Sequence, residues 1–144
     1  MTKPTTLIDT GPLVALVDKG QGEAHRLYKE ALRTSERPLL STWPCLTEAL
    51  YFLHELRGWE GQQALWALIE KDVIRVHHPA AEELRRAAAL MEQYQDTPMD
   101  FADASLVVLA ERTGLRRILT LDRDFYIYQL PGKNVFEVIR LGIA

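Results

Sequence analysis

Short runs of apolar and β-favouring residues alternate along this chain with longer segments in which apolar residues recur at helical spacing. The runs predict five strands, at Thr5–Ile8, Leu39–Thr42, Val73–Val76, Arg117–Leu121 and Asn134–Ile139. Strands that alternate with helices are typical of βαβ units, in which helices cover both faces of a parallel sheet. The pattern therefore predicts an α/β fold: a three-layer α/β/α sandwich with a mostly parallel central sheet of about five strands.

The segments between the strands should form the outer layers. Their apolar spacing predicts helices over Leu13–Val17, Ala24–Ala31, Pro44–Arg57, Leu65–Ile69, Leu84–Met91 and Met99–Arg112. Gly58 is expected to interrupt the pattern between the third and fourth of them. In the fifth, the residues expected to face the core are Leu84, Ala87, Ala88 and Met91.

Length and composition narrow the class of protein. A chain of 144 residues, 47% hydrophobic and 26% charged, suits one soluble domain, so residues 1–144 are expected to form a single domain. The amino terminus lacks the apolar segment of a signal peptide, and no apolar run approaches the roughly 20 residues that span a bilayer. We therefore expect a cytoplasmic protein with no membrane association. Cys45 is the single cysteine, which excludes an internal disulfide and a four-cysteine zinc site.

Acidic residues follow two of the predicted strands. Asp9 and Asp122 stand where the first and fourth strands end, and Glu48 falls in about the first turn of the helix after the second strand. Ligands of open parallel sheets bind beyond the carboxyl ends of the strands, so these acids are expected at one edge. Taken singly, Asp9 could begin a turn, and Glu48 could be a surface acid favoured by the helix dipole.

Asp103 is an acid on an apolar helix face. Its neighbours at helical spacing are Leu106, Val107 and Ala110, and an unpaired carboxylate in such surroundings is unfavourable. An arginine partner would be the structural explanation, and a bound cation would be the functional one. A metal site here would bring Asp103 together with the acids at the sheet edge.

A divalent cation would neutralise such a cluster. Carboxylate oxygens suit Mg²⁺ or Mn²⁺, and the chain offers no cysteine pair or H-E-x-x-H motif for zinc. A water polarised by the metal can attack phosphorus, so hydrolysis of a phosphodiester needs no protein nucleophile. The net charge of −3 argues mildly against nucleic acid binding, but bound cations would reverse the local field at the acids.

Three further charged residues lie beside these acids. Asp100 follows Thr97 and Pro98 in the way a capping-box acid follows its N-cap, although it could also approach a metal through water. Asp124 could be a turn acid, a support for the site, or the ligand in place of Asp122. Arg123 is a candidate for a contact with a substrate phosphate.

Two groups of polar and aromatic residues are expected to be structural. His77 and His78 read as a polar strand end, since no acid or histidine stands at a convincing spacing for a metal site. Trp43, Trp59 and Trp66 are expected to be packing residues, with Trp59 and Trp66 as alternatives for a partner surface.

Four segments together resemble the PIN-domain ribonucleases, and most nearly their VapC-type toxins. They are Leu7–Leu13, Thr47–Glu48, Asp100–Ala104 and Thr120–Phe125, in this order. The resemblance covers essentially the whole chain and implies a PIN-like α/β/α fold with Mg²⁺- or Mn²⁺-dependent endoribonuclease activity. It assigns the metal and catalytic roles to Asp9, Glu48, Asp103 and Asp122, and it matches Thr10 to a residue that orients a metal-bound water.

The same resemblance implies partners. These are an RNA substrate, a small antitoxin that covers the acidic edge and could insert an arginine among the acids, and a second copy of the chain in a homodimer. Rival classes fit less well: the haloacid dehalogenase pattern needs an Asp where this chain has Gly11, and receiver domains need an acid pair and a late lysine. A non-catalytic partner-binding module that keeps the PIN-like fold is the alternative that stays open.

Overall fold

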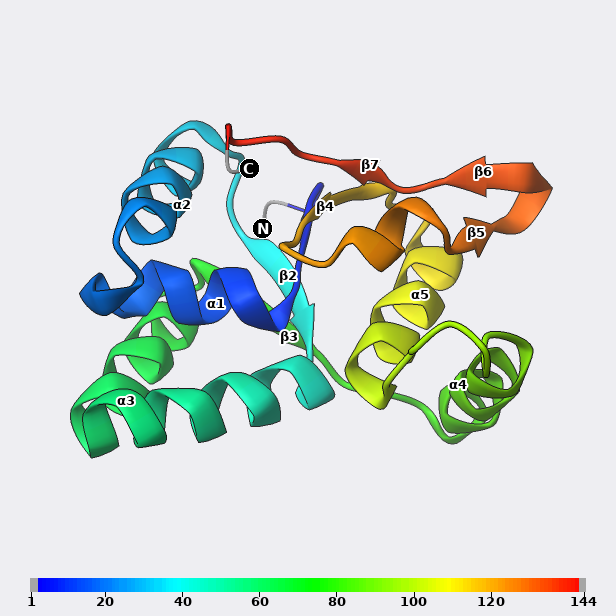
Figure 1. Cartoon of the computed structure of the whole chain (residues 1–144), viewed down its shortest axis with the longest axis horizontal. Coiled ribbons are helices and arrows are strands. Elements are labelled where there is room, and N and C mark those ends of the chain that lie inside the picture. The colour runs from blue at the N-terminus through cyan, green and yellow to red at the C-terminus, as the bar shows by residue number, and fades with distance from the viewer. Residues whose placement is uncertain (1–2, 143–144) are drawn as a thin grey trace.

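The computed structural model describes residues 3–142, and at its centre is a sheet of five parallel strands in the order β3-β2-β1-β4-β7 (Figure 1). The strands are β1 (Leu7–Ile8), β2 (Leu39–Thr42), β3 (Ile74–His77), β4 (Arg117–Leu119) and β7 (Glu137–Val138). Leu7 of β1 stands opposite Leu40 on one side and Ile118 on the other. The first and fourth strands are therefore neighbours, and their carboxyl ends share one edge.

Helices cover the two faces of this sheet. α1 (Thr10–Val17), α2 (Glu23–Thr34) and α3 (Trp43–Glu70) group on one side, with α1 against both of the others (Figure 1). α4 (Ala81–Gln93) and α5 (Phe101–Thr113) pack together on the other side. The short 3₁₀ helices are η1 (Lys19–Gln21), η2 (Arg123–Tyr126) and η3 (Pro131–Lys133). This arrangement confirms the predicted three-layer α/β/α sandwich.

The predicted fifth strand is in fact two strands with different partners. Its first part, β6 (Asn134–Val135), pairs antiparallel with β5 (Gln129–Leu130), which the sequence pattern did not reveal. Its last part, β7, pairs with β4 at the sheet edge. Phe136 between them is buried, and η3 turns the chain with a positive φ at Gly132. The strand β5 of this hairpin also packs against α5.

The helices predicted on either side of Gly58 form one element, α3, with a kink. Gly58 has φ 60° and ψ −149°, outside the helical region and readily reached by glycine. Other elements differ from the prediction only at their ends. The helix α5 ends as its sequence suggests, with Gly114 in the left-handed conformation at its carboxyl cap.

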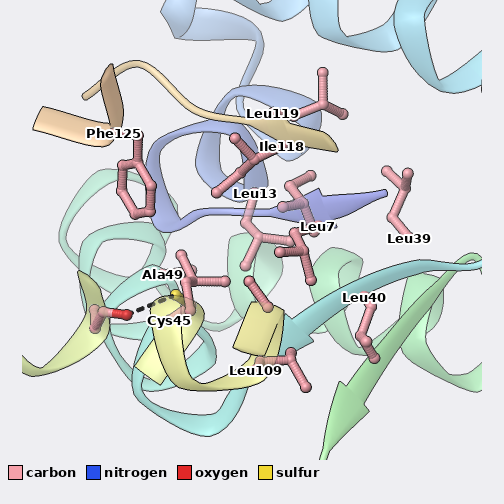
Figure 2. Packing of buried hydrophobic residues seen from close by; sticks show 14 of the residues in the cluster. Leu7, Leu13, Leu39, Leu40, Cys45, Ala49, Leu109, Ile118, Leu119 and Phe125 are labelled. Atoms are coloured by element: carbon pink, nitrogen blue, oxygen red, sulfur yellow. Dashed lines mark hydrogen bonds between the residues drawn. The ribbon is translucent and has the colours of Figure 1, made fainter. Parts of the chain in front are cut away.

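Side chains from both helical layers and the sheet meet in one core (Figure 2). The prediction that Leu84 and Ala88 face it was wrong: Leu84 is 54% exposed, and α4 instead buries Glu83, Ala87 and Leu90. Glu83 is buried because it pairs with His77 and Arg112, so the inward face of α4 is not the purely apolar stripe that the sequence predicted. No helix within residues 3–142 has the length and apolar character that crossing a membrane requires.

The three tryptophans are not core residues. Trp43, Trp59 and Trp66 are 50%, 61% and 38% exposed, so the expectation that they lie in the core was wrong. Trp43 does pack against another side chain, since its ring lies edge-on to that of His78 at a centroid distance of 5.5 Å. All three belong to α3, whose exposed face also carries Tyr51, Phe52 and Leu56.

Candidate active site

Asp9 lies at the carboxyl end of the central strand β1. It is the N-cap of α1, and its carboxylate accepts a hydrogen bond from the Thr10 backbone N–H at 2.7 Å. The Thr120 hydroxyl donates to the other carboxylate oxygen at 2.8 Å, and the Cys45 thiol lies 3.7 Å from the first. Asp9 therefore begins the helix as a turn residue would, while its buried carboxylate is held in one orientation at the sheet edge.

Glu48 reaches the same edge from α3. It lies in the second turn of that helix, not the first as expected, and it is half-buried. The Thr10 hydroxyl donates a hydrogen bond to Glu48 Oε1 at 3.1 Å. Since the Thr10 backbone binds Asp9 and its side chain binds Glu48, this threonine joins two of the predicted site acids.

Asp122 is positioned by the segment that follows β4. That strand ends at Leu119, so Asp122 does not come directly after it as predicted. Its backbone N–H donates to the Thr120 hydroxyl oxygen at 3.0 Å, and the same hydroxyl donates to Asp9. The Asp122 carboxylate caps η2 by accepting a hydrogen bond from the Asp124 backbone N–H at 2.9 Å. Thr120 therefore fixes the first and last acids relative to each other.

Asp103 lies in the first turn of α5 and is only 5% exposed. The Tyr128 hydroxyl donates a hydrogen bond to its Oδ2 at 3.0 Å. The side-chain partner of this acid is thus a neutral donor, not the arginine that a structural role would use. Tyr128 is fully buried and packs edge-on against Phe125 and Tyr94, at ring-centroid distances of 5.1 and 5.2 Å.

Asp100 caps α5. Its carboxylate accepts a hydrogen bond from the Asp103 backbone N–H at 2.8 Å, so the expected capping role is confirmed. The assignment of Thr97 as N-cap and Pro98 as first helical residue was wrong, because the helix begins at Phe101 and Asp100 is itself the N-cap. Asp100 therefore stands at the helix cap itself, whereas the prediction put it three residues after the cap.

Burial and mutual repulsion raise the pKa of all four predicted site acids. Burial is the largest cause at Asp103, whose pKa rises to about 8, followed by the charges of Asp100, Asp9 and Asp122. Burial is also the largest cause of the raised pKa of Asp9, Glu48 and Asp122, and neighbouring acids raise each further. No lysine or arginine of the described chain contributes to these shifts. The fold thus gathers acids without a basic side chain to neutralise them.

The donor chemistry of this cluster fits a hard divalent cation. Mg²⁺ and Mn²⁺ prefer carboxylate oxygens, and a cation would relieve the repulsion, roughly 4 kcal/mol for two carboxylates about 4 Å apart at an effective dielectric constant of about 20. Among residues 3–142, no group of three or more His, Cys, Asp or Glu side chains is arranged so that it could hold a metal as it stands. A closed coordination shell would need these side chains to draw together.

The other candidates surround the cluster or lie outside it. Asp124 supports Asp122 through its backbone and raises the pKa of that acid, so it is a neighbour of the site. Arg123 is exposed beside it. His77 forms a hydrogen bond with Glu83 at 2.9 Å, and this pair joins β3 to α4. The spacing of this acid from His77 was overlooked in reasoning from the sequence.

Two residues that hold the acids were missed by sequence reasoning. Thr120 stands two positions before Asp122 inside one of the segments that carry the family resemblance, so its place there was a usable signal. Tyr128 lies between η2 and β5, where the chain has no regular pattern, and its burial comes from tertiary packing alone.

Comparisons with known proteins show the family to which this chain belongs. The model of the PIN domain family matches residues 6–129. Over 134 residues the chain is 31% identical to ribonuclease VapC26 of Mycobacterium tuberculosis, covering 92% of this chain and 98% of that one. The chain therefore belongs to the PIN domain family, and within it to the VapC-type proteins.

Solved structures share the fold. The crystal structure of Mycobacterium tuberculosis VapC20, a sarcin-ricin loop cleaving toxin, matches with a TM-score of 0.75 at 20% identity, covering 83% of this chain and 91% of that one. A toxin-antitoxin complex from Klebsiella pneumoniae matches with a TM-score of 0.65 at 19% identity, covering 94% and 96%. At identities of 20% and 19%, this structural similarity shows a shared fold and no more.

Proposed function

We propose that this protein is an endoribonuclease that hydrolyses phosphodiester bonds in RNA with Mg²⁺ or Mn²⁺. The single observation that carries the proposal is the convergence of Asp9, Glu48, Asp103 and Asp122 at one sheet edge, each with a raised pKa and none neutralised by a basic side chain. Membership of the PIN domain family and similarity to ribonuclease VapC26 support the same activity.

The four acids would hold the metal, and the groups around them would set their orientation. A bound divalent cation supplies a polarised water and stabilises the departing oxygen. Thr120 and the Thr10 backbone fix the Asp9 carboxylate, and Tyr128 fixes one oxygen of Asp103. The Thr10 hydroxyl donates a hydrogen bond to Glu48, and in the proposed enzyme it would orient a water at the cluster. Burial of the acids excludes bulk solvent and strengthens their interaction with a cation.

The protein acts, in this proposal, as the toxin of a type II toxin-antitoxin pair. The similarity to VapC26 supports this, as does the structural likeness to a toxin that belongs to a toxin-antitoxin complex. The exposed apolar side chains of α3 support a protein partner, since exposed apolar patches mark interaction surfaces. We expect this surface to serve an antitoxin or a second copy of the chain, with the antitoxin also covering the acids.

The test is cleavage of RNA by the purified protein with Mg²⁺, with Mn²⁺ and with EDTA. Wild type should cut with either metal and not with EDTA, and Asp9→Asn should lose at least two orders of magnitude in rate, in the range for loss of a catalytic group. Glu30→Gln, an exposed acid of α2, is the matched control. Mn²⁺ binding followed by electron paramagnetic resonance gives a readout independent of cleavage. Absence of cleavage with any metal, together with a stable partner, would favour the non-catalytic binding module.

A further inference from the structure

A groove of about 680 Å³ runs alongside the acids, between η2 and the segment that follows β7. Thr120 and Asp122 are among the residues that line it, so the groove borders the candidate active site. Val138 and Ile139 line it from β7 and the segment that follows. Its volume lies within the range of about 300–1,000 Å³ that is usual for small-ligand sites.

The charged and aromatic side chains of this groove have a consistent chemistry. Arg123, Tyr126 and Arg140 all line it and are exposed. The Arg140 guanidinium carbon lies 5.8 Å from the centroid of the Tyr126 ring, a cation–π distance. Within residues 3–142 neither arginine forms an ion pair with an acidic side chain. Two positive charges and a half-exposed aromatic ring thus line the groove.

This combination fits a nucleotide of a single strand. Arginine binds phosphate oxygens through paired N–H groups, and aromatic rings stack on bases whose faces are not covered by neighbours in a duplex. The acids at the Asp122 end repel phosphate until a cation is bound, whereas the arginines attract it throughout. A strand in the groove would therefore be anchored at Arg140 and Tyr126 and lead toward Asp122.

We infer that this groove binds the RNA nucleotide next to the cleaved phosphodiester, with Tyr126 stacked on its base and Arg123 and Arg140 on its phosphates. The inference rests on the proposed ribonuclease function, and it adds a substrate-binding site that the acids alone do not define.

The experiment measures binding of a fluorescein-labelled single-stranded RNA of about 12 nucleotides by fluorescence anisotropy, in EDTA and in an Asp9→Asn background that cannot cut. Tyr126→Ala should weaken binding roughly 5- to 100-fold, and Tyr126→Phe should restore it because the ring is kept. Arg140→Ala should weaken binding and lower the slope of log Kd against log salt by about 0.7. Arg85→Ala, an exposed arginine of α4 outside the groove, should change neither.

Unchanged affinity in both Tyr126→Ala and Arg140→Ala, or no binding of the RNA by the parent protein, would overturn the inference. Circular dichroism shows whether each variant is folded, and Arg140 is exposed enough to replace without disturbing the core. Cleavage by the wild type is scored separately. If the wild type cuts RNA but the groove variants bind it with normal affinity, the inferred role of the groove is refuted and the proposed catalysis stands. If the groove variants bind RNA more weakly but the wild type does not cut it, the proposed catalysis is refuted and the groove stands as an RNA-binding site.

Discussion

The Tyr128 hydroxyl donates a hydrogen bond to Oδ2 of Asp103 at 3.0 Å, and both side chains are buried. The bond lowers the pKa of Asp103 and so opposes the rise that burial and the other acids cause. It favours the ionised carboxylate, the form that binds a cation. Tyr128, which lies outside the acidic motifs, therefore helps to keep Asp103 in the ionised form that can bind a cation.

Tyr128→Phe should reduce cleavage at neutral pH by about tenfold, as expected for losing a hydrogen bond to a charged group. Without the hydroxyl the pKa of Asp103 rises further, so the pH dependence of the rate should move toward higher pH. The measurement is the initial rate of RNA cleavage from pH 6 to pH 9. Tyr51→Phe, at an exposed position of α3, is the control. An unshifted profile would argue against this role of Tyr128.

Asp103→Asn should stabilise the metal-free protein while abolishing cleavage. The pKa of Asp103 is 3.8 in a model compound and about 8 in the folded chain, so the folded state holds the proton more tightly. This contribution to stability is fully present below about pH 4 and is lost as pH rises toward 8. The increase in the free energy of unfolding that Asp103→Asn causes should therefore grow as the pH rises over this range, reaching on the order of 1–2 kcal/mol.

Thermal unfolding in EDTA at pH 5 and pH 8 checks this stabilisation. Added Mn²⁺ should raise the melting temperature of the wild type, because a ligand that binds the folded state stabilises it, and should raise that of Asp103→Asn much less. If the asparagine variant were less stable than the wild type at pH 8, burial of the charge and repulsion by the other acids would not control the stability at this position.

Thr120→Val should lower both stability and activity. The valine keeps the shape but removes the donor to Asp9 and the acceptor for the Asp122 backbone N–H. Since this site is buried, the loss should be about 1–3 kcal/mol in the free energy of unfolding. Urea denaturation and the cleavage rate measure the two effects. Thr120→Ser, which retains the hydroxyl, should recover most of each, and equal damage by both substitutions would point to packing.

Cys45 should resist alkylation in the folded protein. Burial, and then the charge of Asp9, raise the pKa of its thiol to about 12, so almost no reactive thiolate forms at pH 8. Labelling by iodoacetamide, followed by mass spectrometry, should proceed at the rate of unfolding and accelerate in urea. Rapid labelling of the native chain would show that α3 opens beside Asp9 more easily than its packing indicates.

The sequence was sufficient to predict the layers of the fold and to single out the acids that the structure brings near one another, because both signals are local. Asp9 follows a short β-favouring run, and Asp103 interrupts an apolar helix face, so each is visible from its immediate neighbours. The short hairpin of β5 and β6 was missed because two-residue strands leave no periodic signal. Trp59 was misjudged because hydrophobicity alone does not separate a core position from an exposed interaction surface.

The supports of the acids depend on tertiary structure. Tyr128 reaches Asp103 because the adjoining strand β5 packs against α5, and nothing near Tyr128 in the chain indicates this. Asp100 was given the right role but the wrong position, since N-cap and capping-box acids differ by a few residues in an otherwise similar pattern. The groove beside Asp122 likewise joins η2 to a segment beyond β7.

The hydrogen bond between Thr120 and Asp9 joins residues that are 111 positions apart. During synthesis Asp9 and Glu48 leave the ribosome long before Asp122 and Tyr128, and the strand β4 that carries Thr120 to β1 is made late. The acids therefore cannot gather on a growing chain until the segment that carries Thr120 and Asp122 has emerged. A copy that stops before this segment lacks the assembled cluster, so the proposed capacity to cut RNA would arise only after the segment has left the ribosome that is making it.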